Sequence, residues 1–254
     1  MSKILAENLN FDYQYNGECF HALNNLNFAI EEGEFACFIG HSGCGKSTLL
    51  KVLAGLLKPT DGCVSIDGHK IIGPNTDRAV VFQDYSLFPW MTAKKNVVFG
   101  IRQADRKKTK SEAEIIAMDY LTKVDMADAA DKYPSQLSGG MRQRVAIARA
   151  LAMNADILLL DEPFGALDAK IRTELQDLMR KIQAGEKKKK TIFFITHDID
   201  EAVLLGDQVY FMKKGNLIEK VEVPFSRFQK REEIYETESY RDLKASLMSL
   251  FYQE

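Results

Sequence analysis

Phosphate-binding chemistry is indicated first by three glycines and a lysine, Gly40, Gly43, Gly45 and Lys46, in the stretch GHSGCGKST. Glycines let backbone N–H groups turn toward an anion, and a helix that begins near Lys46 adds the positive end of its dipole. The Lys46 ammonium can reach outer phosphates, and the Ser47 hydroxyl can hold Mg²⁺. A plain glycine-rich turn before a helix is the alternative. Because an apolar, strand-like run precedes the loop, we expect a phosphate-binding loop for a nucleoside triphosphate. The residues expected to bind the nucleotide are Gly40, His41, Ser42, Gly43, Cys44, Gly45, Lys46, Ser47 and Thr48.

A second candidate anion site lies in the segment LSGGMRQR, at Ser138, Gly139 and Gly140. Serine is a favourable N-cap, and the two glycines expose backbone N–H groups where a helix begins. An ordinary helix cap has much the same pattern, so the segment alone is a weak signal. It gains weight because an apolar, strand-like run begins seventeen residues after Gly140 and ends in a second chemical motif.

That motif is a pair of adjacent carboxylates, Asp161 and Glu162, directly after the buried apolar run 157–160. In a protein with a phosphate-binding loop, Asp161 is expected to help hold Mg²⁺ and Glu162 to polarise the attacking water. A solvated acidic turn is the alternative. His197 also follows an apolar strand, 191–196; a single histidine is most often structural, but ligands of open α/β sheets gather at this edge.

The elements that must position these residues follow from apolar periodicity. The partly alternating runs 4–9 and 22–30 flank the turn-like pair Asn16-Gly17, which predicts an antiparallel β layer. The aromatic residues between them, among them Tyr13 and Tyr15, are more often plain packing than a platform for a base. The remaining expected elements are a helix over 48–57, strands over 63–66, 79–82 and 191–196, a helix marked by apolar residues from 171 to 182, a hairpin over 208–223 and a helical tail from 232. Residues 102–135 are expected to be mostly charged and helical, with an apolar stripe at Ile115, Ile116, Met118, Leu121 and Val124.

Composition narrows the possible classes of function. Thirty-four basic and thirty-six acidic residues give a net charge of −2, so no overall field favours nucleic acid or an anionic membrane surface, and we expect no nucleic-acid partner. The short basic run 187–190 is predicted to be a solvated turn. Four cysteines without a Cys-x-x-Cys pair indicate free thiols, with Cys44 as a small packing residue or, less favoured, a reactive thiol. No run of about eighteen apolar residues and no signal peptide are evident, so we expect a cytoplasmic chain.

Taken in order, the motifs GHSGCGKST, Gln83, LSGGMRQR, ILLLDEP, ALD and His197 resemble the ATPase subunit of ABC transporters over nearly the whole chain. Within that family, the sequence looks most like subunits of nitrate, sulfonate, taurine or bicarbonate importers. The resemblance implies an α/β fold, a P-loop NTPase (RecA-like) core with an N-terminal antiparallel β layer and an inserted α-helical subdomain. It implies a single ABC ATPase domain over 1–254, with the core at about 1–84 and 155–254 and the helical subdomain at about 85–154.

The resemblance also implies a mechanism. Two subunits, identical or paralogous, pair head to tail, and each ATP lies between the phosphate loop of one and Ser138, Gly139 and Gly140 of the other. Tyr13 stacks on adenine, with Tyr15 as the second choice. The other implied roles are a sensor of Mg²⁺ and water for Gln83, a γ-phosphate contact for His197 and a position lining the partner's site for Asp168.

The implied partners are transmembrane permease subunits and, through the whole complex, an extracytoplasmic solute-binding protein. The segment 85–91 is expected to receive a short permease helix, which places the chain peripherally on the cytoplasmic face of the inner membrane. An ABC ATPase acting on DNA or ribosomes is the alternative, but the sequence contains neither a long coiled coil nor a second cassette. LSGGMRQR before ILLLDEP argues against a small-molecule kinase or a regulatory phosphate-loop switch. The solute is not encoded in this chain, because permease and binding protein set specificity.

Overall fold

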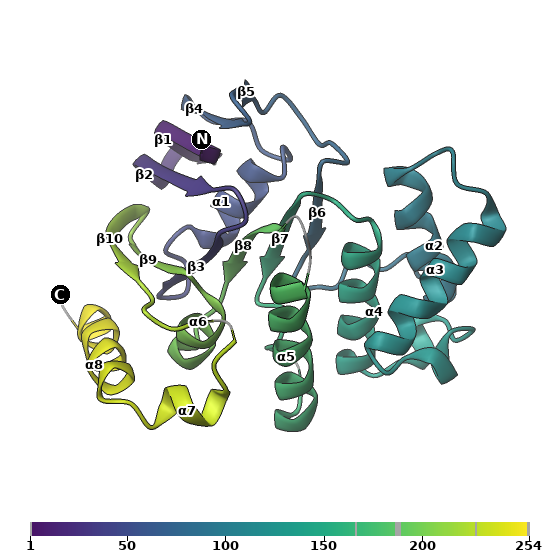
Figure 1. Cartoon of the computed structure of the whole chain (residues 1–254). Helices are drawn as coiled ribbons and strands as arrows, with labels where there is room; N and C mark the ends of the chain where they lie inside the picture. Colours follow the sequence, from purple (N-terminus) through teal and green to yellow (C-terminus); the bar gives the residue numbers. More distant parts are fainter. Residues whose placement is uncertain (1, 166, 186–188, 227, 253–254) are drawn as a thin grey trace. The chain divides into compact units, whose positions relative to one another are not determined.

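The computed structural model describes residues 2–165, 167–185, 189–226 and 228–252 (Figure 1). Contacts divide the chain into two compact units, one formed by Met1–Asn75 with Arg180–Glu254 and the other by Thr76–Met179. The second unit contains the whole span 85–154 and extends beyond it on both sides. The narrower boundaries expected for the helical subdomain remain a prediction.

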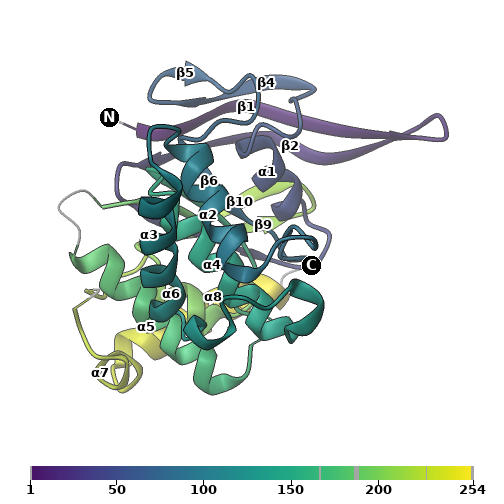
Figure 2. The same ribbon diagram turned by 90° about the vertical axis from the view of Figure 1, so that its right-hand side faces the viewer.

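An antiparallel sheet opens the first unit, with the strand order β2-β1-β4-β5. Strands β1 (Ser2–Tyr15) and β2 (Glu18–Glu31) form a long hairpin, which Figure 2 shows extending along one edge of this sheet. Both turn residues, Asn16 and Gly17, have positive φ angles of 51° and 84°, as a type I′ turn requires. Strand β4 (Asp61–Ile66) pairs with β1, and β5 (His69–Lys70) pairs with β4. The antiparallel layer predicted from alternation and Asn16-Gly17 is confirmed.

The first unit also holds a parallel group of strands around β3 (Phe35–Gly40). On either side of β3 run β8 (Thr191–Ile195) and β9 (Gln208–Lys213), while β10 (Asn216–Glu222) pairs antiparallel with β9. Every residue of β3 and β8 is buried, which explains why these strands read as continuous apolar runs rather than alternating ones. Because β3 and β8 run parallel, their carboxyl ends lie at the same edge of the sheet.

Within the described residues, the helices that lie wholly in this unit are α1 (Lys46–Leu53), α6 (Ile199–Leu205), α7 (Arg231–Tyr235) and α8 (Glu238–Tyr252). The prediction that the first helix extends to residue 57 is wrong, because Gly55 adopts a left-handed φ of 75° that ends the helix. The predicted solvated turn over 187–190 is wrong at Lys190. Its backbone N–H and C=O both bond to the buried side chain of Gln183. Residues 187 and 188 lie outside the described chain.

The second unit pairs β6 (Arg78–Val81) in parallel with β7 (Ile157–Asp161). Helices α2 (Ala93–Ala104), α3 (Lys110–Lys123) and α4 (Gly139–Ala152) pack on one another, and α5 (Ala169–Gly185) begins here (Figure 2). Two single-turn 3₁₀ helices, Ala127–Ala129 and Pro134–Gln136, connect α3 to α4.

The apolar stripe predicted within 102–135 is wrong at Ile115, which is 69% exposed. The stripe is confirmed at Leu121 and Val124, which are buried, and α3 also buries the small residues Ala113 and Ala117. The apolar face predicted for α5 is confirmed at Leu175 and Met179, which are both buried. Among the described residues, no helix has the length and apolar character needed to cross a membrane.

Candidate functional site

The phosphate loop joins the end of β3 to the start of α1. Gly40 and Gly45 have φ angles of 149° and 107°, and a Cβ atom would lie 2.1 Å from the Met212 oxygen at the first position and 2.5 Å from the Ala22 oxygen at the second. Only glycine fits at either place. Helix α1 has no side-chain cap and no acidic residue in its first turn. Its first N–H groups are therefore directed at the loop without a competing carboxylate, which suits an anion.

Lys46 is buried, and its ammonium lies against the loop itself. Nζ donates hydrogen bonds to the carbonyl oxygens of Gly40 at 2.7 Å and His41 at 3.0 Å, and it lies 3.6 Å from Sγ of Cys44. Cys44 is buried as expected of a small packing residue. Ser47 is exposed in the first turn of α1. The cation is thus fixed inside the loop by backbone oxygens rather than by a neighbouring carboxylate.

Tyr13 lies beside this loop. Its hydroxyl is 3.3 Å from Oγ1 of Thr48, and its ring meets Phe11 edge to face at 4.8 Å between centroids. Tyr13 is 38% exposed, whereas Tyr15, near the tip of the hairpin, is 75% exposed. Of the two tyrosines left open by the sequence, Tyr13 has the contact with the phosphate-loop helix.

His197 is exposed at the edge of the sheet from which the phosphate loop departs. Strands β3 and β8 pair Phe38 with Ile195, and the backbone N–H of Thr196 bonds to the carbonyl oxygen of Phe38 at 3.2 Å. The Thr196 hydroxyl donates to the buried carboxylate of Glu201 at 2.7 Å. The structure therefore brings His197 and the phosphate loop to one sheet edge within the first unit.

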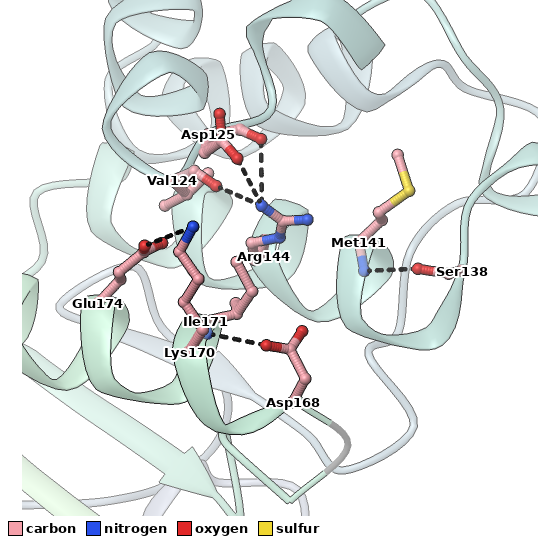
Figure 3. A network of polar contacts seen from close by, with 9 residues as sticks. All are labelled: Val124, Asp125, Ser138, Met141, Arg144, Asp168, Lys170, Ile171 and Glu174. Atoms are coloured by element: carbon pink, nitrogen blue, oxygen red, sulfur yellow. Dashed lines mark hydrogen bonds and ion pairs between the residues drawn. The ribbon is translucent and has the colours of Figure 1, made fainter.

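In the second unit, Ser138 caps α4, as the sequence predicts. Its hydroxyl oxygen accepts a hydrogen bond from the Met141 N–H at 3.3 Å, and its side chain is exposed (Figure 3). The same helix is braced by Arg144, whose Nη1 reaches the Asp125 carboxylate at 3.2 Å (Figure 3). Gly139 and Gly140 form its first turn, so their N–H groups are among those left over at the helix start.

The expected catalytic carboxylates follow β7. Asp161 is buried at the strand end, and Glu162 has a left-handed φ of 46°, a conformation uncommon for a residue other than glycine. Asp168 bonds to the Ile171 N–H at 3.1 Å near the start of α5 (Figure 3). Gln83 is exposed just after β6. Because β6 and β7 are parallel neighbours, Gln83 and the carboxylates lie at one edge of the sheet.

The loop after Gln83 is held by two residues that the sequence did not single out, Asn96 and Arg149. Arg149 donates to the carbonyl oxygens of Ser86 at 2.8 Å and Tyr85 at 3.3 Å, and burial lowers its pKa. Asn96 is fully buried and bonds to the backbone of Phe88 in both directions. The sequence signal that could have indicated Asn96 is the presence of a polar asparagine beside the apolar residue Val97 in α2.

A groove of about 650 Å³ lies beside this loop. Its apolar lining includes Met91, Val98 and Phe99, and its charged lining is mostly basic, with Lys94 and Arg102 among several cations. Trp90, at the end of the loop, is 69% exposed. The loop and groove together present aromatic and apolar surface surrounded by positive charge, a surface typical of partner binding.

Fold and site together define an ATP-binding cassette ATPase, and the chain belongs to the ABC transporter family, which matches residues 23–165. As a member of this family it binds ATP. It is 46% identical to the bicarbonate transport ATP-binding protein CmpD of Synechocystis sp., over 92% of this chain and 83% of that protein. It is 44% identical to the nitrate import ATP-binding protein NrtD of Synechococcus elongatus, over 91% of this chain and 85% of the relative.

Solved structures agree with the fold class. The ATP-binding cassette MJ0796, in a dimeric post-hydrolysis state bound to ADP and Pi, superposes with a TM-score of 0.80 at 35% identity. The match covers 88% of this chain and all of that one. The predicted α/β P-loop NTPase fold and ATPase class are confirmed.

Proposed function

We propose that this chain is the ATP-hydrolysing subunit that energises import of a small anion, such as bicarbonate or nitrate, through separate permease subunits. The observation that carries the proposal is the likeness to the bicarbonate and nitrate relatives over more than nine-tenths of this chain. A second copy of the chain, or a paralogous subunit, completes the catalytic unit. Its proposed place is peripheral, on the cytoplasmic face of the membrane that holds the permease. An extracytoplasmic binding protein delivers the solute.

The phosphate loop is proposed to bind the ATP phosphates. Lys46 lies where an ammonium can exchange the carbonyl oxygens of Gly40 and His41 for outer phosphate oxygens. Tyr13 is proposed to stack on the adenine, since its hydroxyl contacts Thr48 in the first turn of α1 and so holds the residue beside the phosphate loop. His197 is proposed to donate to the γ-phosphate from the neighbouring strand.

Ser47, Gln83 and Asp161 are proposed to hold Mg²⁺. Hydroxyl, amide and carboxylate oxygens are the donors that this ion prefers, so the residue set fits it. When bound, the ion offsets negative charge on the phosphate oxygens. Glu162 accepts a proton from the attacking water and orients it, which requires a carboxylate rather than an amide.

Ser138, Gly139 and Gly140 are proposed to bind the ATP held by the partner subunit, with Asp168 lining that same composite site. Helix α4 begins with a capping serine and two glycines but no lysine. Such a helix start suits a phosphate whose lysine partner is supplied by another chain. ATP then favours the closed dimer, because only that form offers both sets of contacts. Hydrolysis removes the preference and lets the dimer open.

The loop and groove around Trp90 are proposed to receive a short amphipathic segment of the permease. The apolar lining at Met91, Val98 and Phe99 suits apolar anchors, and Lys94 and Arg102 favour acidic residues or a helix C-terminus on the partner. Closure and opening of the ATPase dimer are thereby passed to the membrane subunits.

Two substitutions test the ATPase site. Lys46→Ala is expected to weaken ATP binding measured by calorimetry, and unchanged affinity would contradict the phosphate-loop assignment. Glu162→Gln is expected to keep ATP binding, lose hydrolysis and accumulate as a dimer with ATP in size-exclusion chromatography. The control is Glu174→Gln, which alters an exposed carboxylate on α5 paired with Lys170. A Glu162→Gln variant that stays monomeric or fully active would refute the assigned role.

Transport is tested by recovery of the chain from cells. Copurification with a multi-helix permease, and loss of that complex in a Trp90→Asp variant, would support the importer assignment. Sedimentation with ribosomes or recovery with DNA would leave the ATPase chemistry intact and overturn the transport role.

A further inference from the structure

The end of helix α8 contacts the phosphate loop. Nε2 of His41 lies 3.0 Å from the backbone oxygen of Phe251, and the two rings meet edge to face with centroids 5.2 Å apart. The Phe251 ring also packs edge to face on Phe211 of β9, at 4.9 Å. One aromatic side chain of α8 therefore touches both a residue of the nucleotide loop and the buried sheet beneath it.

Helix α8 is fixed at its other end by contacts near the start of α6. Asp200 accepts a hydrogen bond from the Tyr240 hydroxyl at 2.6 Å, and Nζ of Lys244 lies 2.6 Å from the same carboxylate. Leu247 and Leu250 are buried along the helix. With these anchors, the position of Phe251 follows from the packing of the whole helix rather than from its own contact with His41.

His41 is consequently held from two sides. Its carbonyl oxygen accepts from Lys46 on the inner side of the loop, while its ring meets Phe251 on the outer side. The neighbouring positions Gly40, Gly43 and Gly45 are glycines with positive φ, which lose the most conformational freedom when the loop is ordered. The contact of His41 with Phe251 therefore limits the conformations of a loop whose glycines limit them least.

We propose that Phe251 is a positioning residue for nucleotide binding: through His41 it holds the phosphate loop in the shape that binds ATP. The inference rests on the proposed assignment of this loop as the ATP site. Phe251 itself does not touch the nucleotide, so its effect belongs to binding rather than to the hydrolytic step. Removing its ring allows the loop more conformations, and ATP must then order it.

The test compares ATP affinities of the full-length chain by calorimetry with MgATP. Phe251→Ala is expected to raise Kd by about three- to tenfold, the scale of one aromatic contact. The KM for ATP rises by the same factor, with kcat changed less than about twofold. Tyr252→Ala is the matched control, because this neighbouring aromatic residue is 79% exposed and is expected to leave Kd unchanged. Phe251→Tyr keeps the ring and is expected to restore the affinity.

A double-mutant cycle assigns the effect to the contact. In a His41→Ala background, Phe251→Ala is expected to change Kd by less than about twofold, since the ring has lost its partner. Equal effects in both backgrounds, a tighter Kd for Phe251→Ala, or the same loss in Tyr252→Ala would each overturn the proposal. Lys46→Ala distinguishes failure of the positioning role from failure of the ATP-site assignment. If Lys46→Ala weakens ATP binding and Phe251→Ala does not, only the positioning role fails. If Lys46→Ala has no effect, the ATP site itself is misassigned. Thermal unfolding of each variant confirms that the measured protein is folded.

Discussion

Replacing Asn96 with alanine removes the side chain that fastens the loop after Gln83 to helix α2. The Asn96 side-chain oxygen accepts from the Phe88 N–H at 2.8 Å, and its amide nitrogen donates to the carbonyl oxygens of Phe88, Met91 and Thr92 at 3.1 to 3.2 Å. The side chain is 0% exposed, so water does not compete for it. The loop residues contribute to the proposed permease surface, which makes this contact relevant to coupling.

The magnitude follows from which groups lose their partners. The Phe88 oxygen also accepts from the Met91 N–H, and the Thr92 oxygen from the Asn96 N–H, so both stay bonded in the variant. The Phe88 N–H and the Met91 oxygen must find new partners. A buried polar group left unsatisfied costs about 1–3 kcal/mol, and both groups are only half-buried. We therefore expect Asn96→Ala to lower the free energy of unfolding by about 2–3 kcal/mol.

The assay is urea unfolding followed by tryptophan fluorescence. Trp90 is the chain's only tryptophan and lies in the loop itself, with its ring 5.5 Å from that of Phe88. A loss of this size corresponds to a midpoint lower by about 1 M urea. Lys95→Ala is the control, because it changes the adjacent, exposed residue of the same helix.

A second variant sharpens the test. Asn96→Asp keeps an acceptor for the Phe88 N–H but loses the donors and places negative charge near the Met91 and Thr92 oxygens, so it is expected to be at least as destabilised as Asn96→Ala. A change below about 0.5 kcal/mol for Asn96→Ala would show that ring packing and Arg149 hold the loop without this asparagine.

Two further predictions concern the first unit. Gly40→Ala is expected to abolish ATP binding and to lower the free energy of unfolding by about 3 kcal/mol, because the added Cβ would meet the Met212 oxygen. Gly73→Ala is the control, since there is open space around its Cβ position. Unchanged ATP affinity of Gly40→Ala in calorimetry would contradict the loop geometry. Burial, with the nearby Glu34 carboxylate, raises the pKa of Tyr210 well above its ordinary value of about 10. Since the folded state keeps this proton while the unfolded state loses it, stability falls as pH rises above about 10, by up to about 1.4 kcal/mol per pH unit, until pH reaches the raised pKa. Urea unfolding between pH 9 and 11 checks this slope, and an equally steep slope in Tyr210→Phe would assign it to other groups.

Local sequence was sufficient where backbone geometry depends on neighbouring residues. The glycines of the phosphate loop have positive φ angles, which only glycine adopts freely, and Asn16-Gly17 forms the expected hairpin turn. Ser138 caps the helix that it was expected to begin. In each case the contacts that determine the backbone conformation lie within a few residues, so the local sequence pattern is enough to predict that conformation.

Contacts between distant residues could not be predicted in this way. Arg149 reaches Ser86 across 63 positions, and His41 meets Phe251 across 210. Periodicity also misplaced Ile115, because α3 buries Ala113 and Ala117 together with Leu121 and leaves Ile115 exposed. The functional roles of the site residues remain predictions from motif and position, since partner and nucleotide complete the site.

The placement of β3 has a consequence for the order of events during synthesis. This wholly buried strand pairs Phe35 with Ile192 of β8, about 150 residues later in the chain. At 5–20 residues per second, a ribosome needs roughly 8 to 30 s to supply that partner. Meanwhile the continuous segment 76–179 can fold as it emerges. The apolar run 35–39 lacks its partner strand β8 during this time and stays in contact with water or with chaperones. The strand from which the phosphate loop departs is thus among the first made and among the last to be enclosed.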